Sequence, residues 1–434
     1  MLLYEKQNCN EHIGKSIVYG RYSDGMQAEL NTTIMRDDDY FELIMNIVIS
    51  RIFIATNNSI FYSADYKNWK KIRIPYDLLS TIFSLCYSSD KNKFVAVGAP
   101  LRGKSNNIIY STSGTIWKNA ETVGYNPGII LCAFYSEKIQ KFIIGGYGYL
   151  GISDNAINWN HIRLDGDDST LINDNFDPKT WSGICGTFFD ICAICESSDI
   201  IIAIGGNRQS CNIIWSINGL QWNVAKISDD TRILSDVYKP VNCYPSCICY
   251  SSSLNLFIVG VEFSDGIVPD KLFLFSNDGK VWKDSKEYSK VLYDGNGTGI
   301  TWDYSPAEAI VRVNGLVSII AIMSVYSICW SPLLNLFVAS VKCAAEVESD
   351  RLIGKTQIIL YCLIYSNNGI NWKVTDLQFQ NIIIYSIYWD STYSRFVGTG
   401  DKSSVVYSSD AKVWTYTQFE LGNQNQTGIV VSGF

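Results

Sequence analysis

Histidine is nearly absent from this chain, and its scarcity removes the usual parts of several catalytic sites. His12 and His161 are the only two histidines in 434 residues. A Ser-His-Asp or Cys-His arrangement needs a positioned imidazole as its base, and a catalytic zinc site commonly uses two or three histidines. We therefore expect no cofactor and no catalytic residues, and the protein is predicted not to be an enzyme.

Clusters of lysine and arginine are also missing. The formal net charge is −7 and the isoelectric point is near 5.1. A surface that binds nucleic acid needs gathered basic side chains to displace counterions from phosphate. We expect a protein partner, with glycan as the alternative, and no nucleic acid.

No basic region followed by an apolar run opens the chain, so no secretory signal is predicted. Thirteen cysteines without such a signal indicate reduced thiols and an intracellular, non-secreted protein. The abundance of Ile and Asn fits an AT-rich genome, such as that of a large DNA virus or an intracellular parasite. The expected location is the cytoplasm, or the virion if the source is viral.

One stretch, from Val313 to Val341, lacks charged residues entirely and is long enough to imitate a membrane span. Asn314, Pro332 and Asn335 interrupt it, and its second half follows the repeat described below. We therefore predict soluble strands here and no membrane span.

A phrase of seven residues, beginning with Ser and ending with Trp, is present seven times. The copies are Ser63 to Trp69, Ser111 to Trp117, Ser153 to Trp159, Ser216 to Trp222, Ser276 to Trp282, Ser366 to Trp372 and Ser408 to Trp414. The third residue is Asp, Asn or Ser, and the fourth is Gly in four copies and Ala in two. Such residues form tight turns between antiparallel strands, so each copy predicts strand, turn, strand.

A second pattern precedes six of the phrases and predicts another hairpin. An aromatic or Cys residue, here called the A marker, is followed seven positions later by Phe or Ile. The pairs are Tyr87 and Phe94, Tyr135 and Phe142, Cys195 and Ile202, Tyr250 and Phe257, Trp330 and Phe337, and Trp389 and Phe396. Each unit then has four antiparallel strands, A to D, and the smallest spacing between phrases, 42 residues, is typical of propeller repeats. The predicted fold is an all-β, seven-bladed β-propeller of four-stranded antiparallel blades.

The first blade lacks its A marker, which raises the question of how the ring closes. Successive A markers follow the phrase Trp by 17 or 18 residues in the short connections, and 17 residues beyond Trp414 lies Val431. We predict that residues 427–434 complete blade one, with Leu43 to Val48 as the alternative. The predicted blades cover residues 45–75, 80–122, 128–165, 186–228, 245–286, 323–378 and 382–420. Residues 1–44 would be an N-terminal extension that packs on or caps the propeller.

Insertions vary only in the connections from D to A and from B to C, which emerge on one face of such a disc. The D-to-A connections expand before blades four, five and six, and the B-to-C connection reaches 29 residues in blade six. Insertions tend to map to the binding face of repeat proteins. The partner site is therefore predicted on this face over blades three to six, and deleting residues 285–322 should abolish partner capture. Aromatic residues of the insertions are the partner-binding candidates: Trp181, Tyr238, Tyr244, Tyr293, Trp302 and Tyr304.

Two groups of side chains resemble metal sites. Asp165, Asp167 and Asp168 offer oxygen ligands that suit Ca²⁺ but lack the spacing of a calcium loop, so a solvated acidic loop is the preferred interpretation. Cys192 and Cys195 have the spacing of a redox or zinc motif. Cys192 falls three residues before an A marker and Cys195 is the marker itself, so we expect both to be core residues of a strand.

Phrases such as Ser-Asn-Asn-Gly-Ile-Asn-Trp372 and Ser-Asn-Asp-Gly-Lys-Val-Trp282 resemble the Asp-box, or bacterial neuraminidase repeat, of sialidase-like propellers. The phrase here is one residue shorter than the usual box. The resemblance extends from about Arg51 to the C-terminus and implies the propeller fold. Sialidases also use three arginines to clamp the substrate carboxylate, and none of the six marked A strands contains an arginine. The predicted function is a non-enzymatic scaffold for protein-protein interaction or assembly, with a carbohydrate-binding or sialidase-like propeller as the alternative.

Overall fold

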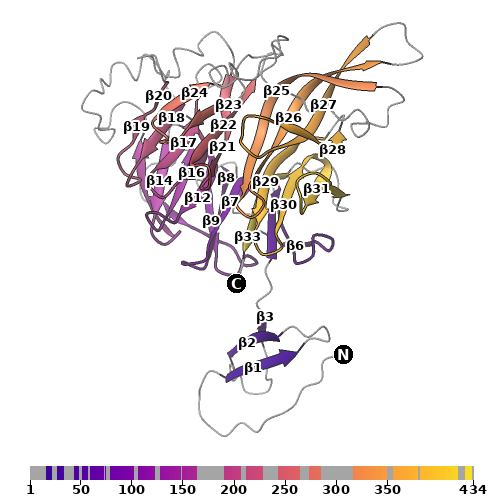
Figure 1. The fold of residues 1–434 in the computed structure, drawn as a ribbon. Helices are drawn as coiled ribbons and strands as arrows, with labels where there is room; N and C mark the ends of the chain where they lie inside the picture. The colour runs from indigo at the N-terminus through magenta and orange to yellow at the C-terminus, as the bar shows by residue number, and fades with distance from the viewer. Residues whose placement is uncertain are drawn as a thin grey trace.

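The protein is a seven-bladed β-propeller, as predicted (Figure 1). The structure, a computed structural model, describes residues 16–21, 27–33, 44–47, 51–56, 59–72, 74, 79–101, 106–122, 128–147, 149–163, 190–206, 212–227, 243–263, 273–284, 316–348, 355–379, 382–418 and 426–432. Within these ranges every regular element is a β-strand except one 3-10 turn, Asp401–Ser403.

Each blade is an antiparallel sheet with its A strand innermost. Blade one contains β33 (Gln426–Ser432), β4 (Arg51–Thr56), β5 (Ile60–Ser63) and β6 (Lys70–Ile72). Blade two contains β7 (Leu79–Ser88), β8 (Lys93–Pro100), β9 (Ile108–Ser111) and β10 (Lys118–Asn119). Blade three contains β12 (Ile130–Ser136), β13 (Lys141–Gly146), β14 (Tyr149–Ser153) and β15 (Asn158–Arg163). Blade four contains β16 (Ile191–Glu196), β17 (Ile201–Gly205), β18 (Asn212–Ser216) and β19 (Asn223–Val224).

The last three blades follow the same order. Blade five contains β21 (Cys243–Ser251), β22 (Leu256–Phe263), β23 (Phe273–Ser276) and β24 (Val281–Asp284). Blade six contains β25 (Leu316–Ser331), β26 (Leu336–Glu348), β27 (Lys355–Ser366) and β28 (Lys373–Phe379). Blade seven contains β29 (Ile384–Asp390), β30 (Arg395–Gly400), β31 (Ser404–Ser408) and β32 (Thr415–Gln418). Two short strands, β11 (Glu121–Thr122) and β20 (Lys226–Ile227), add a parallel edge to blades three and five.

The ring closes through the C-terminal strand. β33 pairs with β4 in antiparallel register, Ser432 opposite Arg51, and its neighbours in the ring are β29 and β7. The alternative closing strand is wrong, because β3 (Ile44–Ile47) pairs with β2 (Gln27–Thr33), which pairs with β1 (Ser16–Arg21), in a separate sheet. The end of β33 and the start of β4 therefore lie at the face formed by the A-to-B hairpins (Figure 1). That residues 1–44 pack on the propeller stays a prediction.

Marker residues are direct cross-strand partners in the A-to-B hairpins. Tyr87 pairs with Phe94, and their ring centroids lie 4.4 Å apart. Trp330 and Phe337 of blade six pair in the same way at 4.4 Å. Opposed aromatic pairs stabilise neighbouring strands, which explains why the spacing of seven residues recurs.

The Ser-to-Trp phrase is the turn between strands C and D, and its side chains bond its own backbone. In blade six the Gly369 N–H donates to Ser366 Oγ at 2.9 Å. Asn368 Oδ1 accepts the N–H groups of the fifth and sixth residues at 2.9 and 2.8 Å. Trp372 Nε1 donates to the Gly369 carbonyl at 2.9 Å, and Trp372 is buried. The phrase therefore satisfies a sharp turn locally and anchors it to the core through the indole.

Acid should weaken three of these turns. Burial alone would raise the pKa of Asp65, Asp278 and Asp410, but hydrogen bonds from turn N–H groups and the phrase serine outweigh it, so each pKa is lowered. A lowered folded-state pKa stabilises the fold above about pH 4, the unfolded value, and the gain is lost as the pH falls further. Three other phrases carry Asn at this position, so the variant D65N/D278N/D410N should keep the turns.

We expect this triple variant to lose less of its melting temperature between pH 7 and pH 3 than the wild type does. The change Asp154→Asn, at an exposed carboxylate outside the third position, is the control and should leave the dependence of melting temperature on pH nearly unchanged. Equal losses in the triple variant and the wild type would show that these three carboxylates do not govern acid sensitivity.

Each phrase also joins its blade to the preceding one through its fourth residue, which has a positive φ between 63° and 74°. A Cβ on Gly279 would lie 2.5 Å from Ile202 of blade four, and one on Gly369 would lie 2.2 Å from Ile258 of blade five. Glycine is therefore used where the backbone turn presses directly against the neighbouring blade.

The junction between blades seven and one carries a tyrosine at this same position. Tyr66 has φ 63° and is 2% exposed, and its hydroxyl donates to Asp390, which is completely buried. The Arg395 guanidinium lies over the rings of Tyr66 at 4.9 Å, Tyr407 at 5.6 Å and Tyr393 at 5.9 Å. These side chains join blade one to blade seven, in addition to the chain itself, which runs from blade seven into β33 of blade one.

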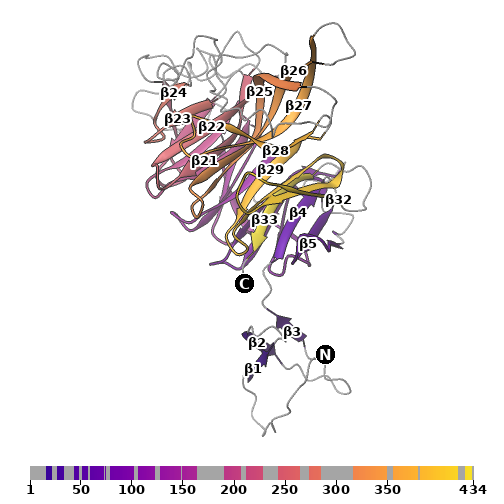
Figure 2. The same cartoon turned by 45° about the vertical axis from the view of Figure 1, so that its right-hand side comes forward.

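The long B-to-C connection predicted for blade six is mostly strand. β26 and β27 pair from Phe337 and Ser366 out to Glu348 and Lys355, and they extend beyond the other blades (Figures 1 and 2). The uncharged stretch from Val313 to Val341 contributes to β25 and β26. Among the described residues, no helix is long and apolar enough to cross a membrane.

Candidate functional site

The predicted binding face is the one from which the D-to-A and B-to-C connections emerge. The candidates Trp181, Tyr238, Tyr293, Trp302 and Tyr304 and the acidic residues Asp165, Asp167 and Asp168 lie outside the described residues. The sixth candidate, Tyr244, lies in β21, where its backbone pairs with Glu262 of β22 at the insertion-bearing end of blade five. The roles of these residues stay predictions.

Three half-buried tyrosines meet at this face, from blades six and seven. The ring of Tyr326, in β25, lies 6.3 Å from that of Tyr361, in β27. It lies 6.1 Å from that of Tyr385, in β29, in an edge-to-face arrangement. Tyr326 and Tyr385 meet because β25 and β29, the inner strands of neighbouring blades, lie side by side. The long β27 extends far enough toward the insertion-bearing face to bring Tyr361 beside them.

Two carboxylates accompany the tyrosines. Asp401 begins the 3-10 turn after β30, and its Oδ2 accepts the Ile383 N–H at 3.1 Å while its own N–H donates to the Ile383 carbonyl at 2.9 Å. Burial raises the pKa of Tyr385, and the Asp401 carboxylate, which accepts a hydrogen bond from its hydroxyl, raises it further, followed by Tyr361 and Glu262. Burial and then Asp401 raise the pKa of Tyr361. Tyr326, Tyr361, Tyr385, Asp401 and Glu262 are called the tyrosine–carboxylate cluster below.

The electrostatics of the cluster favour positive ligands. A cation over the face of a tyrosine ring is attracted by the ring quadrupole, and a nearby carboxylate adds a charge of opposite sign. The seven inner strands, including β33, contain no Lys, Arg or His. The inner strands therefore bring no cationic side chain to the cluster, and the nearest lysine by register is Lys342 of β26, the cross-strand partner of Tyr361.

Two cysteines of the inner strands donate hydrogen bonds to the backbone of the next blade. Cys192 Sγ donates to the Pro245 carbonyl of the next blade at 3.0 Å, and Cys132 Sγ donates to the Ile191 carbonyl at 3.7 Å. In other blades, serine occupies the same place. Ser84 accepts an N–H of blade three at 3.1 Å, and Ser327 accepts one of blade seven at 2.9 Å.

These small polar groups lie at β-bulges of the A strands and bond the backbone of the adjacent blade. Burial raises the pKa of Cys192, and it raises that of Cys195 to about 12, so both are held as thiols at neutral pH. Within the described ranges, no three Cys, His, Asp or Glu side chains are arranged to hold a metal ion.

Of the two histidines, His161 lies in the described residues, in β15. Its Nδ1 lies 2.9 Å from the Tyr149 hydroxyl, and burial lowers its pKa. Tyr149 is fully buried in blade three, and His161 lies half-buried beside it. This environment indicates a histidine packed against the blade.

The sequence did not single out Tyr326, Tyr361, Tyr385, Asp401 or Glu262. None belongs to a phrase or to a marker pair. The one available signal was that Tyr326 and Tyr385 both precede their A markers by four residues, Trp330 and Trp389.

Comparisons with known proteins give similarity of shape only. No family model matches the chain, and no curated protein matches it. Solved structures similar to it include a protein from Lactobacillus plantarum, at 10% identity and a TM-score of 0.48 over 88% of this chain and 99% of the other. A putative 6-phosphogluconolactonase from Bacteroides fragilis is similar at 9% identity and a TM-score of 0.45, over 88% and 98% of the two chains. The WD40 β-propeller domain of Doa1 is similar at 10% identity and a TM-score of 0.42, over 81% and 88%.

Proposed function

We propose that this protein is a non-enzymatic propeller that binds a basic segment of a partner protein on its insertion-bearing face. The tyrosine–carboxylate cluster supports the proposal, because half-buried aromatic rings beside carboxylates suit Lys and Arg side chains. The insertions of blades three to six would add contacts around it. The net charge of −7 favours encounter with a basic partner.

The variant D401N/E262Q tests this proposal, because it removes both charges of the cluster and retains oxygen atoms for backbone bonds. A fluorescein-labelled peptide of five Arg-Ala repeats serves as the probe, with five Gln-Ala repeats as the neutral reference. We expect the charged probe to bind the wild type, and the variant to bind it about tenfold more weakly in fluorescence anisotropy. D154N/D199N removes two exposed carboxylates at the turns of the opposite face and should bind the probe as the wild type does. Equal binding by wild type and D401N/E262Q would contradict the proposal.

The insertion deletion needs new limits. Residues 316–322 belong to β25, and Ile322 is 2% exposed in the core, so a deletion of 285–322 would damage blade six itself. A deletion of 286–314 closed by a short Gly-Ser linker leaves β24 and β25 intact. If the insertion contributes to binding, this variant should melt as the wild type does and capture less partner.

The glycan alternative uses the same tyrosines, since aromatic rings also stack on sugars. A glycan array and a fluorogenic sialoside assay on the wild type and on D401N/E262Q separate the two functions. Binding of a neutral glycan that survives loss of both carboxylates would favour the alternative.

A further inference from the structure

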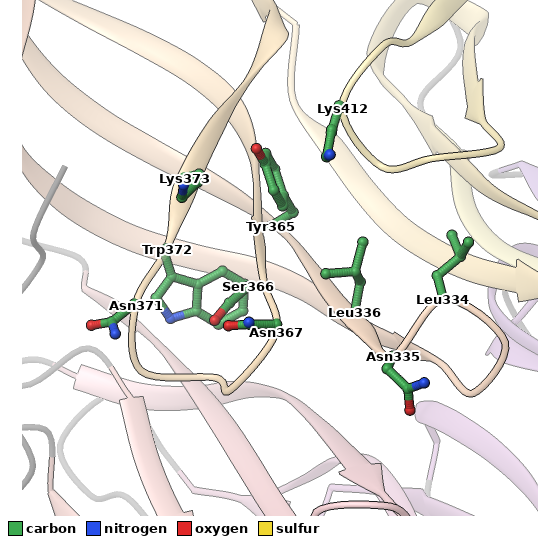
Figure 3. A pocket seen from close by; sticks show the side chains of 10 residues that line it. All are labelled: Leu334, Asn335, Leu336, Tyr365, Ser366, Asn367, Asn371, Trp372, Lys373 and Lys412. Carbon is green, nitrogen blue, oxygen red and sulfur yellow. The ribbon is translucent and has the colours of Figure 1, made fainter. Parts of the chain in front are cut away.

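A groove of about 760 Å³ opens at the junction of blades six and seven, near the A-to-B and C-to-D turns (Figure 3). This position places it on the face opposite the insertions. Leu336 and Tyr365 form an apolar wall, and Trp372, which also borders the groove, turns its ring away to stack on Phe273 of blade five. A volume of this size lies within the roughly 300–1,000 Å³ of ligand sites in proteins.

The polar side chains of the groove share one kind of chemistry. Its charged residues are both lysines, Lys373 from blade six and Lys412 from the turn of blade seven. Its rim also carries the amides of Asn335, Asn367 and Asn371, which can donate to and accept from an extended peptide backbone. The protein as a whole is acidic, with a net charge of −7, but this groove carries two lysines from separate blades. Their positive charges suit carboxylate groups of a ligand.

The junction of blades four and five has the corresponding aromatic residue and lysine in direct contact. Trp215 immediately precedes the phrase of blade four, as Tyr365 does in blade six. Lys280 is the fifth residue of the phrase in blade five, as Lys412 is in blade seven. There the Lys280 ammonium lies 4.8 Å from the centroid of the Trp215 ring, so lysine and aromatic ring satisfy each other. At the junction of blades six and seven, Tyr365 and Lys412 instead line two sides of an open groove (Figure 3).

We propose that this groove binds an acidic peptide segment, with a carboxylate between Lys373 and Lys412 and an apolar side chain against Tyr365 and Leu336. The site is separate from the tyrosine–carboxylate cluster and does not depend on the function proposed for it. It gives the protein two faces of opposite preference, one for basic and one for acidic segments.

Selection from a phage-displayed library of random ten-residue peptides tests the proposal, with the variant K373E/K412E as competitor in solution. We expect the enriched peptides to be rich in Asp and Glu. A fluorescein-labelled copy of the most enriched peptide should bind the wild type and lose affinity about tenfold or more in K373E/K412E. Added salt should weaken the binding.

The matched control is K70E/K118E. Lys70 and Lys118 are exposed and follow the phrase Trp of blades one and two as Lys373 follows Trp372, so the charge change is the same at places outside the groove. This control and D401N/E262Q should bind the peptide as the wild type does, and all variants should melt at nearly the same temperature. Enrichment of neutral or basic peptides, no enrichment, or equal binding by K373E/K412E would overturn the proposal.

Discussion

Replacing Asp390 with alanine is expected to lower the free energy of unfolding by about 3 kcal/mol. The carboxylate is fully buried at the junction where the ring closes, and it accepts the Tyr66 hydroxyl together with the N–H groups of Thr392 and Tyr393 at 2.9 and 3.2 Å. Alanine leaves the hydroxyl of Tyr66, a residue that is 2% exposed, without its acceptor. Urea unfolding followed by tryptophan fluorescence measures the change.

Two companion variants separate the contributions at this junction. Tyr66→Phe removes only the hydroxyl and should cost about 1.5 kcal/mol, since the aromatic contacts with Arg395 remain. Ser331→Ala alters the position of blade six that matches Asp390, where the serine accepts a single N–H at 3.1 Å, and should cost about 1 kcal/mol. If Asp390→Ala costs no more than Ser331→Ala, the junction is not held by this network.

Gly114→Ala should be nearly as damaging, with an expected cost of about 2–4 kcal/mol. Gly114 has φ 71°, and an added Cβ would lie 2.5 Å from the ring of Phe53 in blade one. Phe53 is completely buried and packs on Phe94 with ring centroids 4.7 Å apart, so it cannot move aside freely. The cost combines a left-handed backbone with an overfilled core.

The chain supplies its own control for this change. Ala156 occupies the same place in blade three with φ 63°, so there the neighbouring blade already accommodates a methyl group. Ala156→Gly should change the stability by no more than about 1 kcal/mol, because relief of the backbone offsets the lost contact. If Gly114→Ala lowers the free energy of unfolding by less than the loss of one buried methyl contact would, then Phe53 has room to shift.

The number of blades, the strand order within them and the closing strand could all be predicted from the sequence. The blades and their strand order depend on interactions within about twenty residues, such as the bond from Asn368 to its own turn or the pairing of Tyr87 with Phe94. Local chemistry of this kind is repeated along the chain, so it is readable as a pattern of spacing. The closing strand pairs with the distant β4, and it was predicted because Val431 follows Trp414 at the same spacing as the other A markers. Insertion lengths were readable in the same way, but length alone did not reveal that β26 and β27 extend through most of the blade six connection.

Only the tertiary structure determines which residues, far apart in the sequence, lie in contact. Tyr66 and Asp390 are 324 residues apart and meet because the ring closes on itself. The tyrosine–carboxylate cluster draws on blades five, six and seven with no shared motif in the sequence, and the groove brings together phrase residues of two blades. The repeat thus determined the disc, because turn and hairpin chemistry is local. The surfaces proposed to bind partners depend on side chains that the closed ring alone brings together.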